Sequence, residues 1–412
     1  MITKEQFKKL VNVKFIEKDG NIYCGKLNLC GRKDITELPD NLKVLGGLDL
    51  RNSGITKLPK GLEVEEFLDI SETDIEELPE DTKFGKSLFL EKMKKPFSFP
   101  KVVKVNGRFG CYDTTIKRMP EELYTEDDCN FSGSTFDNLP KVMEIRGSLL
   151  LRDAAITKLP EGLKEVYGRL SISNTKVTKL PDNLVVHDGL DFNYTSIKEL
   201  SKGLIVGYGL NFGNDSLMDY SNLHKVCSSF ITTEKKYNEI KDTLAKHSKK
   251  LMVLGEVFIT FEPNYKGAYL FENENGKYID VDNIFGKLIE QKGNVYHVKL
   301  GKRKDIIYLV TDGNGHWAHG VTLDEAKDDL LFKISEKNKD GYKDLTLDSE
   351  LSFNEAIVCY RVITGACSFG TNDFIKNRLG ENRKDSYTIK EIIDLTKGEY
   401  GSGAFRDFFC KG

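Results

Sequence analysis

The stretches LDLRNSGITKLPKGL (48–62) and LSISNTKVTKLPDNL (170–184) decide the fold of the first half of this 412-residue chain. Each contains two apolar residues separated by one position, a small hydroxyl residue three positions later, and a Leu-Pro pair. The proline of that pair recurs at steps of 20 or 21 residues, as Pro39, Pro59, Pro79, Pro100, Pro120, Pro140, Pro160 and Pro181. So regular an interval indicates a repeat architecture, in which each unit buries its apolar face against its neighbours.

The physical chemistry of this repeat predicts a coil. Apolar residues at every second position make a strand with one buried face, and the proline holds an extended segment on the far side because it donates no ladder hydrogen bond. Successive turns stack about 4.8 Å apart, as strands of a sheet do. The recurring hydroxyl groups are expected to bond backbone groups inside the coil. The sequence therefore predicts a β-solenoid of 20–21-residue turns.

The repeat resembles that of bacterial and phage leucine-rich-repeat proteins, whose short units read L-x-L-x-x-T-x-I-x-x-L-P-x-x-L. The resemblance covers residues 24–220 and implies a scaffold that carries a recognition surface, without implying one activity. Residues 1–23 are expected to form an N-terminal cap, because Thr3 and Gln6 fit a capping box before a short helix.

The middle residue of each L-x-L segment should point away from the coil interior. This row and its neighbours are our predicted protein-binding face, which consists of Asp49, Asp69, Phe89, Tyr112, Asn130, Leu150, Asp191 and Tyr194. The alternative is that the chain's own C-terminal half covers this face. One irregular turn adds a lysine-rich bulge with Lys92, Lys94, Lys95 and Lys101. We expect that bulge to be solvated, and nucleic-acid binding through it is the weaker alternative.

Bulk properties exclude several classes of protein. The 61 basic residues nearly balance the 64 acidic ones, so no overall field recruits nucleic acid or an anionic membrane. The N-terminus lacks the apolar run of a signal peptide, and no stretch reaches the roughly 20 apolar residues that span a bilayer. Eight scattered cysteines without a CxxC pair suit reduced thiols. We therefore expect a cytoplasmic protein without a metal or cofactor.

The second half has a different pattern. Residues 221–250 are expected to form a capping helix and linker, and residues 251–412 an α+β C-terminal domain. Short alternating segments between 251 and 315 predict antiparallel strands. Capping boxes at Thr322 with Glu325 and at Ser352 with Glu355 then predict helices, the second of which ends at Gly365. The overall fold class is thus α+β, with a solenoid followed by a mixed antiparallel-sheet and helical domain.

The stretch TDGNGHWAHG (311–320) holds the chain's single tryptophan and the histidines His316 and His319. We interpret it as a hairpin whose tryptophan closes a core. The catalytic alternative pairs Cys367, at an expected helix start, with His319 or His316. This order resembles cysteine proteases that act on ubiquitin-like proteins, although Ser368 follows the cysteine where that family has glycine. A zinc site formed by both histidines, Cys359 and Cys367 is a further alternative.

These observations favour a non-enzymatic protein that binds a protein partner. Residues 305–410 resemble C-terminal modules of phage-borne proteins, and that likeness implies an accessory factor acting on a host component, such as a defence system. Bacterial leucine-rich-repeat ubiquitin ligases join similar repeats to a catalytic cysteine domain, but that domain is larger and wholly helical. The alternative function is a Cys/His-dependent hydrolase or transferase that uses the solenoid to select its substrate.

Overall fold

The computed structural model describes residues 2–11, 13–213, 226–227, 229–232, 234–245, 250–253, 258–262, 268–282, 284–301, 305–334, 339–380 and 383–410. The chain divides into two compact units. The first consists of residues 1–264 and 269–285, and the second of residues 265–268 and 286–412. The expected end of the solenoid at 220 and the start of the linker at 221 lie outside the described residues.

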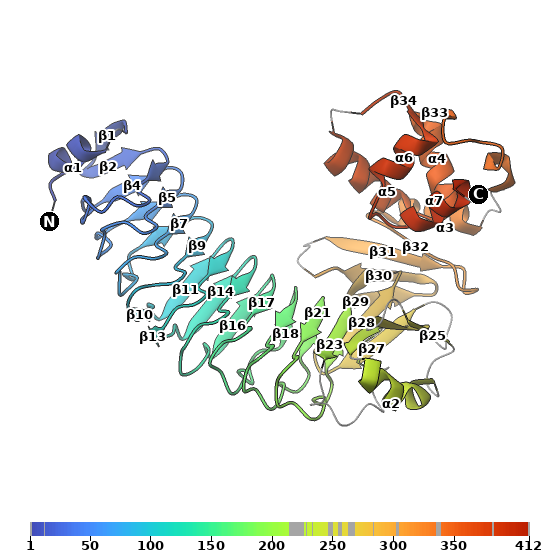
Figure 1. Cartoon of the computed structure of the whole chain (residues 1–412), viewed down its shortest axis with the longest axis horizontal. Helices are drawn as coiled ribbons and strands as arrows, with labels where there is room; N and C mark the ends of the chain where they lie inside the picture. Colours follow the sequence, from blue (N-terminus) through green and yellow to red (C-terminus); the bar gives the residue numbers. More distant parts are fainter. Residues whose placement is uncertain are drawn as a thin grey trace. The chain divides into compact units, whose positions relative to one another are not determined.

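The first unit is a β-solenoid, as the repeat predicts. The L-x-L segments form the parallel part of a long sheet, and Figure 1 shows its strands stacked turn upon turn. In chain order these strands are β3 (Leu27–Asn28), β5 (Leu48–Asp49), β7 (Leu68–Asp69), β9 (Leu88–Phe89), β12 (Phe109–Gly110), β15 (Cys129–Asn130), β17 (Leu149–Leu150), β19 (Leu170–Ser171), β21 (Gly189–Asp191) and β23 (Gly209–Gly213). Equivalent residues pair in register, for example Leu48 with Leu68.

A second strand in most turns lies after the proline and forms the other side of the coil. Two sheets share this side, one before and one after the lysine-rich turn. The first contains β2 (Asn21–Cys24), β4 (Leu42–Val44), β6 (Glu63–Val64) and β8 (Lys83–Phe84), and the second contains β11 (Val102–Val105), β14 (Glu122–Thr125), β16 (Val142–Ile145), β18 (Glu165–Val166), β20 (Val185–Val186) and β22 (Ile205–Val206). In the lysine-rich turn, β10 (Phe97–Ser98) pairs instead with β13 (Ile116–Arg118).

The buried hydroxyl groups inside the coil bond backbone groups, which confirms the predicted ladder. The hydroxyl of Thr73 donates to the carbonyl oxygen of Ile70 at 2.6 Å, and that of Thr114 donates to the carbonyl oxygen of Leu90 at 3.0 Å. Each hydroxyl satisfies a carbonyl group where the chain leaves the strand and its ladder ends. The hydrophobic core around these hydroxyl groups is buried along the length of the described solenoid.

The first coil is covered by helix α1 (Lys4–Leu10) and by strand β1 (Phe15–Lys18), which pairs antiparallel with β2. Thr3 and Gln6 form the predicted capping box at the start of α1. Phe7 on this helix is fully buried in the solenoid core. The N-terminal segment therefore closes the apolar end that the first turn would otherwise expose.

The long sheet continues beyond β23 with β24 (Ser229–Thr232), β26 (Phe258–Glu262) and β25 (Lys250–Val253). Helix α2 (Glu234–Ala245) lies between β24 and β25 in the chain. Strands β27 (Tyr269–Asn273) and β28 (Gly276–Val281) form an antiparallel hairpin in the same unit. Phe271 and Tyr278 of this hairpin pack against Val185 and Ile205 of the solenoid.

The second unit contains an antiparallel meander and a group of helices. Its strands are β29 (Ile284–Lys292), which begins in the first unit, then β30 (Val295–Lys299), β31 (Ile306–Thr311) and β32 (Trp317–Gly320). Helix α3 (Leu323–Ile334) follows and packs on the meander, with Ala326 against Ala318 and Val310. The Thr322 and Glu325 cap at its start is present, because Glu325 N donates to the Thr322 hydroxyl.

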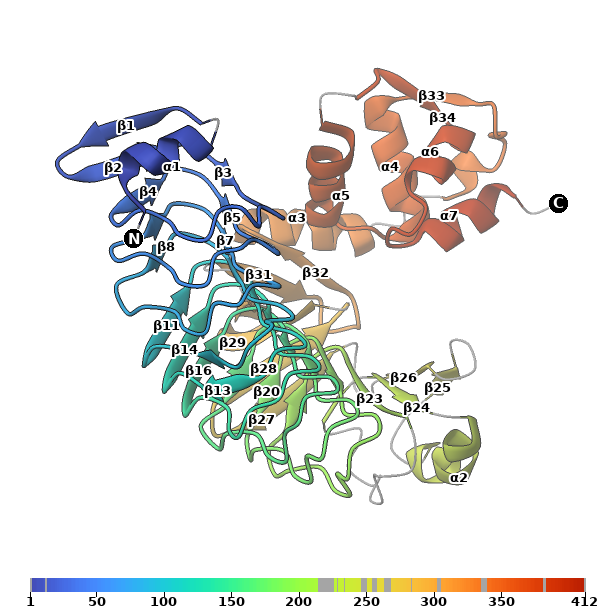
Figure 2. The same ribbon diagram turned by 60° about the vertical axis from the view of Figure 1, so that its left-hand side comes forward.

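The rest of the described chain contains a small apolar core of its own and several further elements. They are the 3₁₀ helix η2 (Lys339–Tyr342), β33 (Glu350–Ser352), α4 (Phe353–Thr364), α5 (Ser368–Phe374), the π-helix η3 (Ile375–Leu379), β34 (Ser386–Thr388), α6 (Ile389–Leu395) and α7 (Ser402–Phe409). Figure 2 shows α4, α6 and α7 grouped together. Helix α4 begins at the predicted Ser352 capping box and ends at Gly365, whose φ of 75° suits glycine. The predicted α+β fold class is thus confirmed.

Candidate functional site: a cysteine and histidine contact

The side chains of Cys367 and His319 meet in the second unit. The sulfur of Cys367 lies 3.2 Å from Nε2 of His319, although 48 positions separate them in the chain. His319 lies on β32, and Cys367 is the N-cap residue of α5. Both residues are part-buried, so the pair is neither sealed in a core nor fully solvated. A thiol and an imidazole nitrogen within hydrogen-bond reach form the arrangement that a nucleophile and a general base would require.

The hairpin that carries His319 is built as its sequence predicts. Trp317 is buried and its ring packs against Tyr296 with centroids 5.1 Å apart. Residues at every second position of a strand share a face, so His319 lies on the same face of β32 as Trp317. The turn before β32 is closed by Asp312, whose carboxylate accepts hydrogen bonds from the backbone N–H groups of Asn314 and His316.

His316 takes part in that turn and not in the contact with Cys367. Its Nδ1 lies 2.6 Å from Oδ2 of Asp312, and its side chain is exposed. The hydrogen bond with His316 is the main cause that lowers the pKa of Asp312 to about 2. Of the two candidate bases in the sequence, the structure therefore brings only His319 to the cysteine, and it gives His316 a structural role in the hairpin.

Its surroundings favour the protonated form of the Cys367 thiol. Burial is the main cause that raises its pKa above the ordinary value, and the charge of Asp329 adds to it. The backbone N–H of Gly370, 3.3 Å from the sulfur, lowers the pKa, as do the charges of Lys333 and Arg361. Because burial is the largest cause, the environment favours a neutral thiol over a preformed thiolate.

Two further residues of this site were not found from the sequence. Asp329 on α3 is 2% exposed, and its carboxylate accepts a hydrogen bond from the backbone N–H of Ser368 at 2.7 Å. The same carboxylate forms an ion pair with Arg361 on α4. Arg361 also donates through Nε to the carbonyl oxygen of Ala366, at 3.1 Å. An Asp in one amphipathic helix and an Arg in another give no local signal that they meet.

The alternative zinc site does not form as the sequence suggests it could. Cys359 is fully buried on α4 in an apolar cluster with Tyr360 and Phe405, and burial raises its pKa to about 12. His316 is bonded to Asp312, which leaves Cys367 and His319 as the only two of the four residues in contact. Over the described part of the chain, no group of three or more His, Cys, Asp or Glu side chains could hold a metal ion.

The predicted binding face of the solenoid divides into two kinds of residue. Its polar members each accept a hydrogen bond from the backbone N–H two positions later: Asp49 from Arg51, Asp69 from Ser71, Asn130 from Ser132 and Asp191 from Asn193. Such side chains stabilise the turn that ends each strand. Asp49 also forms an ion pair with Arg51 and is only 5% exposed. A local structural role therefore accounts for the residue type at these positions.

The apolar and aromatic members of that face have no such role. Phe89, Leu150 and Tyr112 are part-buried, and Tyr194 is 62% exposed. Tyr194 has a φ of 56°, in the left-handed region that a bulky side chain rarely adopts. The four lysines of the irregular turn are exposed, whereas Phe97 and Phe99 beside them are fully buried. Lys92 lies over the ring of Tyr112, with Nζ 5.5 Å from the centroid.

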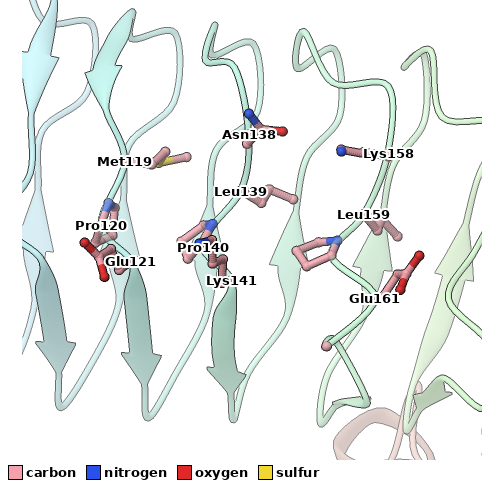
Figure 3. Close-up of a pocket in the computed structure, with 12 residues that line it drawn as sticks. Met119, Pro120, Glu121, Asn138, Leu139, Pro140, Lys141, Lys158, Leu159 and Glu161 are labelled. Atoms are coloured by element: carbon pink, nitrogen blue, oxygen red, sulfur yellow. The ribbon is translucent and has the colours of Figure 1, made fainter.

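A shallow pocket lies elsewhere on the solenoid, along its proline edge. It has a volume of about 620 Å³ and is lined by the Leu-Pro or Met-Pro pairs of three successive turns. Figure 3 shows the side chains of Met119, Leu139 and Leu159 in this row. The charged residues around it alternate in sign, with Glu121 and Glu161 beside Lys141 and Lys158. Because both charges line the pocket, its lining does not indicate which class of ligand it would bind.

Within the described residues, no helix combines the length and the apolar character that crossing a membrane requires. Comparisons with protein-family models, with curated proteins and with solved structures found no match to this chain. Its architecture and its site therefore stand on the residues and geometry described above.

Proposed function

We propose that the second unit carries a thiol-dependent acyl-transfer centre, with Cys367 as nucleophile and His319 as general base. One observation supports this proposal: the sulfur of Cys367 lies 3.2 Å from Nε2 of His319, and both residues are part-buried. A thiol with a raised pKa needs a base within hydrogen-bond reach before it can attack a carbonyl carbon. The sequence alone favours a non-enzymatic protein, and this contact makes the hydrolase or transferase the better-supported alternative.

The reaction would proceed in two steps. Nε2 of His319 takes the thiol proton while the sulfur of Cys367 bonds to the carbonyl carbon of the substrate. The tetrahedral intermediate collapses to a thioester, and the leaving group departs with the proton that His319 returns. In the second step, water or another acceptor loses a proton to His319 and attacks the thioester. The acid or transfer product is released, and the proton returns to the sulfur of Cys367.

This mechanism requires one tautomer of His319. In the proposed resting state S–H donates to Nε2, which requires that Nε2 be the unprotonated nitrogen and that Nδ1 carry the ring proton. The neutral pair differs from the thiolate and imidazolium pair of thiols with a lowered pKa. Proton transfer is then part of the attack, and the loss of His319 should slow the chemical step itself.

The test is single-turnover acylation by p-nitrophenyl acetate. In a Cys30→Ser/Cys410→Ser background, Cys367 is the one cysteine that is not buried. We expect release of p-nitrophenolate together with acetylation of Cys367, detected by mass spectrometry of the intact protein and its peptides. His319→Asn should slow acylation about 100-fold or more, as loss of a general base does.

His316→Asn is the matched control, because it removes the neighbouring histidine without touching the cysteine. Equal acylation rates in the parent and the His319→Asn protein would refute the proposed role of His319. Acetylation at other residues, with Cys367 unmodified, would refute the nucleophile.

A second candidate is the non-enzymatic interaction protein, favoured by an exposed aromatic residue on the predicted binding face of the solenoid. Tyr194 is 62% exposed, and its left-handed φ is shared by the equivalent turn residues of other repeats, such as Asn52 and Asn174, so its exposure is the observation that favours a partner contact. The partner would be a host protein if the chain is phage-borne, as the sequence resemblance implies. Loss of a captured host protein on Tyr194→Ala, with retention in Cys367→Ala, would favour this candidate. In the first proposal, the same face selects the substrate.

A further inference from the structure

We infer that Asp329 and Arg361 are positioning residues: their ion pair braces the backbone on both sides of Cys367 and aligns its sulfur with His319. The inference rests on the proposed function, whose nucleophile and base it presupposes. It goes beyond that proposal by assigning the alignment of the pair to two residues that touch neither the sulfur nor the imidazole in any hydrogen bond described above.

The brace holds the peptide groups that flank the cysteine. On one side, Oδ2 of Asp329 accepts from the backbone N–H of Ser368, at 2.7 Å. On the other side, Nε of Arg361 donates to the carbonyl oxygen of Ala366, at 3.1 Å. The remaining carboxylate oxygen of Asp329 and Nη2 of Arg361 bond to each other and join the two halves. Cys367 thus lies between two fixed backbone points.

Burial makes this ion pair rigid and costly to break. Asp329 is 2% exposed, and the guanidinium of Arg361 lies over the ring of Phe332 at 4.1 Å from its centroid. Burying two charges is not by itself a gain in stability, because desolvation offsets their attraction unless further hydrogen bonds satisfy them. Here the further hydrogen bonds go to the residues on either side of Cys367, so the pair's geometry is tied to the position of the sulfur.

The helix that carries Asp329 also holds the strand that carries His319. Lys333 on α3 donates through Nζ to the carbonyl oxygen of Trp317, at 2.7 Å, and Ala326 packs against Ala318. These contacts hold β32 at Trp317 and Ala318, the two residues that precede His319. Helix α3 therefore contacts both parts of the site: it packs on β32, which carries His319, and its Asp329 bonds the backbone next to Cys367.

The test measures alkylation of Cys367 by iodoacetamide in the full-length Cys30→Ser/Cys410→Ser protein, with and without His319→Asn. Asp329→Asn keeps the shape of the side chain and removes its charge. We expect it to slow the His319-dependent alkylation about 10-fold to 100-fold, as a misplacement of the reacting groups does. In the His319→Asn background, the same substitution should change the rate less than about 2-fold, because coupled residues are not additive.

Asp328→Asn is the matched control, since Asp328 is the exposed neighbour of Asp329 on the same helix. Asp329→Asn leaves a buried guanidinium unpaired and can weaken the fold, so the double variant Asp329→Asn/Arg361→Gln repeats the measurement with a neutral pair. Circular dichroism checks that each variant is folded.

Equal slowing with and without His319 would overturn the inference, as would a folded neutral-pair variant that reacts at the parent rate. A different outcome would refute the proposed function alone. In that outcome p-nitrophenyl acetate leaves Cys367 unmodified, while alkylation of Cys367 by iodoacetamide still depends on His319 and Asp329. If His319→Asn leaves the alkylation rate of Cys367 unchanged, the positioning role is also refuted, because the alignment of the sulfur with His319 then has no effect on reactivity.

Discussion

At the scale of single residues, the environment of Cys367 decides between two kinds of thiol chemistry. A thiol with a lowered pKa reacts as a standing thiolate, whereas a thiol with a raised pKa depends on a neighbouring base. Burial places Cys367 in the second group, even though Lys333 and Arg361 oppose that effect. In the proposed mechanism, the contact with His319 makes such a thiol usable near neutral pH.

The first prediction concerns the pH dependence of this thiol. In the Cys30→Ser/Cys410→Ser background with His319→Asn, the rate of alkylation by iodoacetamide should still be rising at pH 9, where an ordinary thiol begins to level off. Burial favours the neutral thiol and so raises the pKa of Cys367, which means that a higher pH is needed to form the thiolate. A plateau near neutral pH would contradict the prediction and would indicate a stable thiolate.

The second prediction concerns Asp312 in the hairpin turn. Its carboxyl group should titrate at about 2 in an NMR pH titration, and His316→Asn should move the pKa upward toward its ordinary value. The folded-state pKa is lowered, so this carboxylate stabilises the fold above the unfolded pKa, and that contribution is lost as the pH falls toward 2. An unchanged titration in His316→Asn would show that the backbone N–H groups alone lower the pKa.

At the scale of elements, the repeat unit contains most of the information that its fold requires. The L-x-L segments, the recurring proline and the hydroxyl at a fixed slot each have a local physical consequence, so the long parallel sheet and its hydroxyl ladder could be predicted. The helix limits at Ser352 and Gly365 could be predicted for the same reason, because a capping box and a left-handed glycine are local signals.

The third prediction tests one step of the hydroxyl ladder. Thr114→Val keeps the side-chain shape but leaves the carbonyl oxygen of Leu90 and the N–H of Met93 without their buried hydroxyl partner. Unsatisfied buried groups of this kind cost about 1–3 kcal/mol in the free energy of unfolding. Thr115→Val, at the exposed neighbouring position, is the control. Urea denaturation with equal midpoints for the two variants would contradict the prediction.

The candidate site could be predicted only in part, and the reason is again physical. Cys367 and His319 were named because each residue type suits the chemistry, but their contact depends on how α5 packs beside β32. The same holds for Asp329 and Arg361, which meet across two helices. On the far side of the solenoid, the proline predicts an extended segment, and the structure shows that this segment forms a strand in most turns, such as Glu63–Val64.

At the scale of the whole molecule, the first unit shows how a solenoid closes its exposed surfaces. The outward slot of the proline-side strands is polar at Glu63 and Glu165 but apolar at Val185 and Ile205. These two residues are nevertheless buried, because the hairpin formed by β27 and β28 covers them. The change from polar to apolar is the sequence signal for that packing, and it could have been read from the repeat alignment.

The fourth prediction tests this closure. Nδ2 of Asn273, at the tip of the hairpin, donates to the carbonyl oxygens of Asn183 and Gly203 at 3.1 and 2.7 Å. Asn273→Ala removes both hydrogen bonds, which contribute about 1 kcal/mol each. Local opening should then become easier, so hydrogen exchange of the backbone amides in β20, β22 and β28 should accelerate about 5-fold to 30-fold. Glu274→Ala, at the exposed neighbouring position, should leave those rates unchanged. If both variants exchange at the parent rate, the Asn273 contacts contribute nothing to the closure, and the hairpin is held by the packing of Phe271 and Tyr278 and by the hydrogen bond from Asn275 to Asn183.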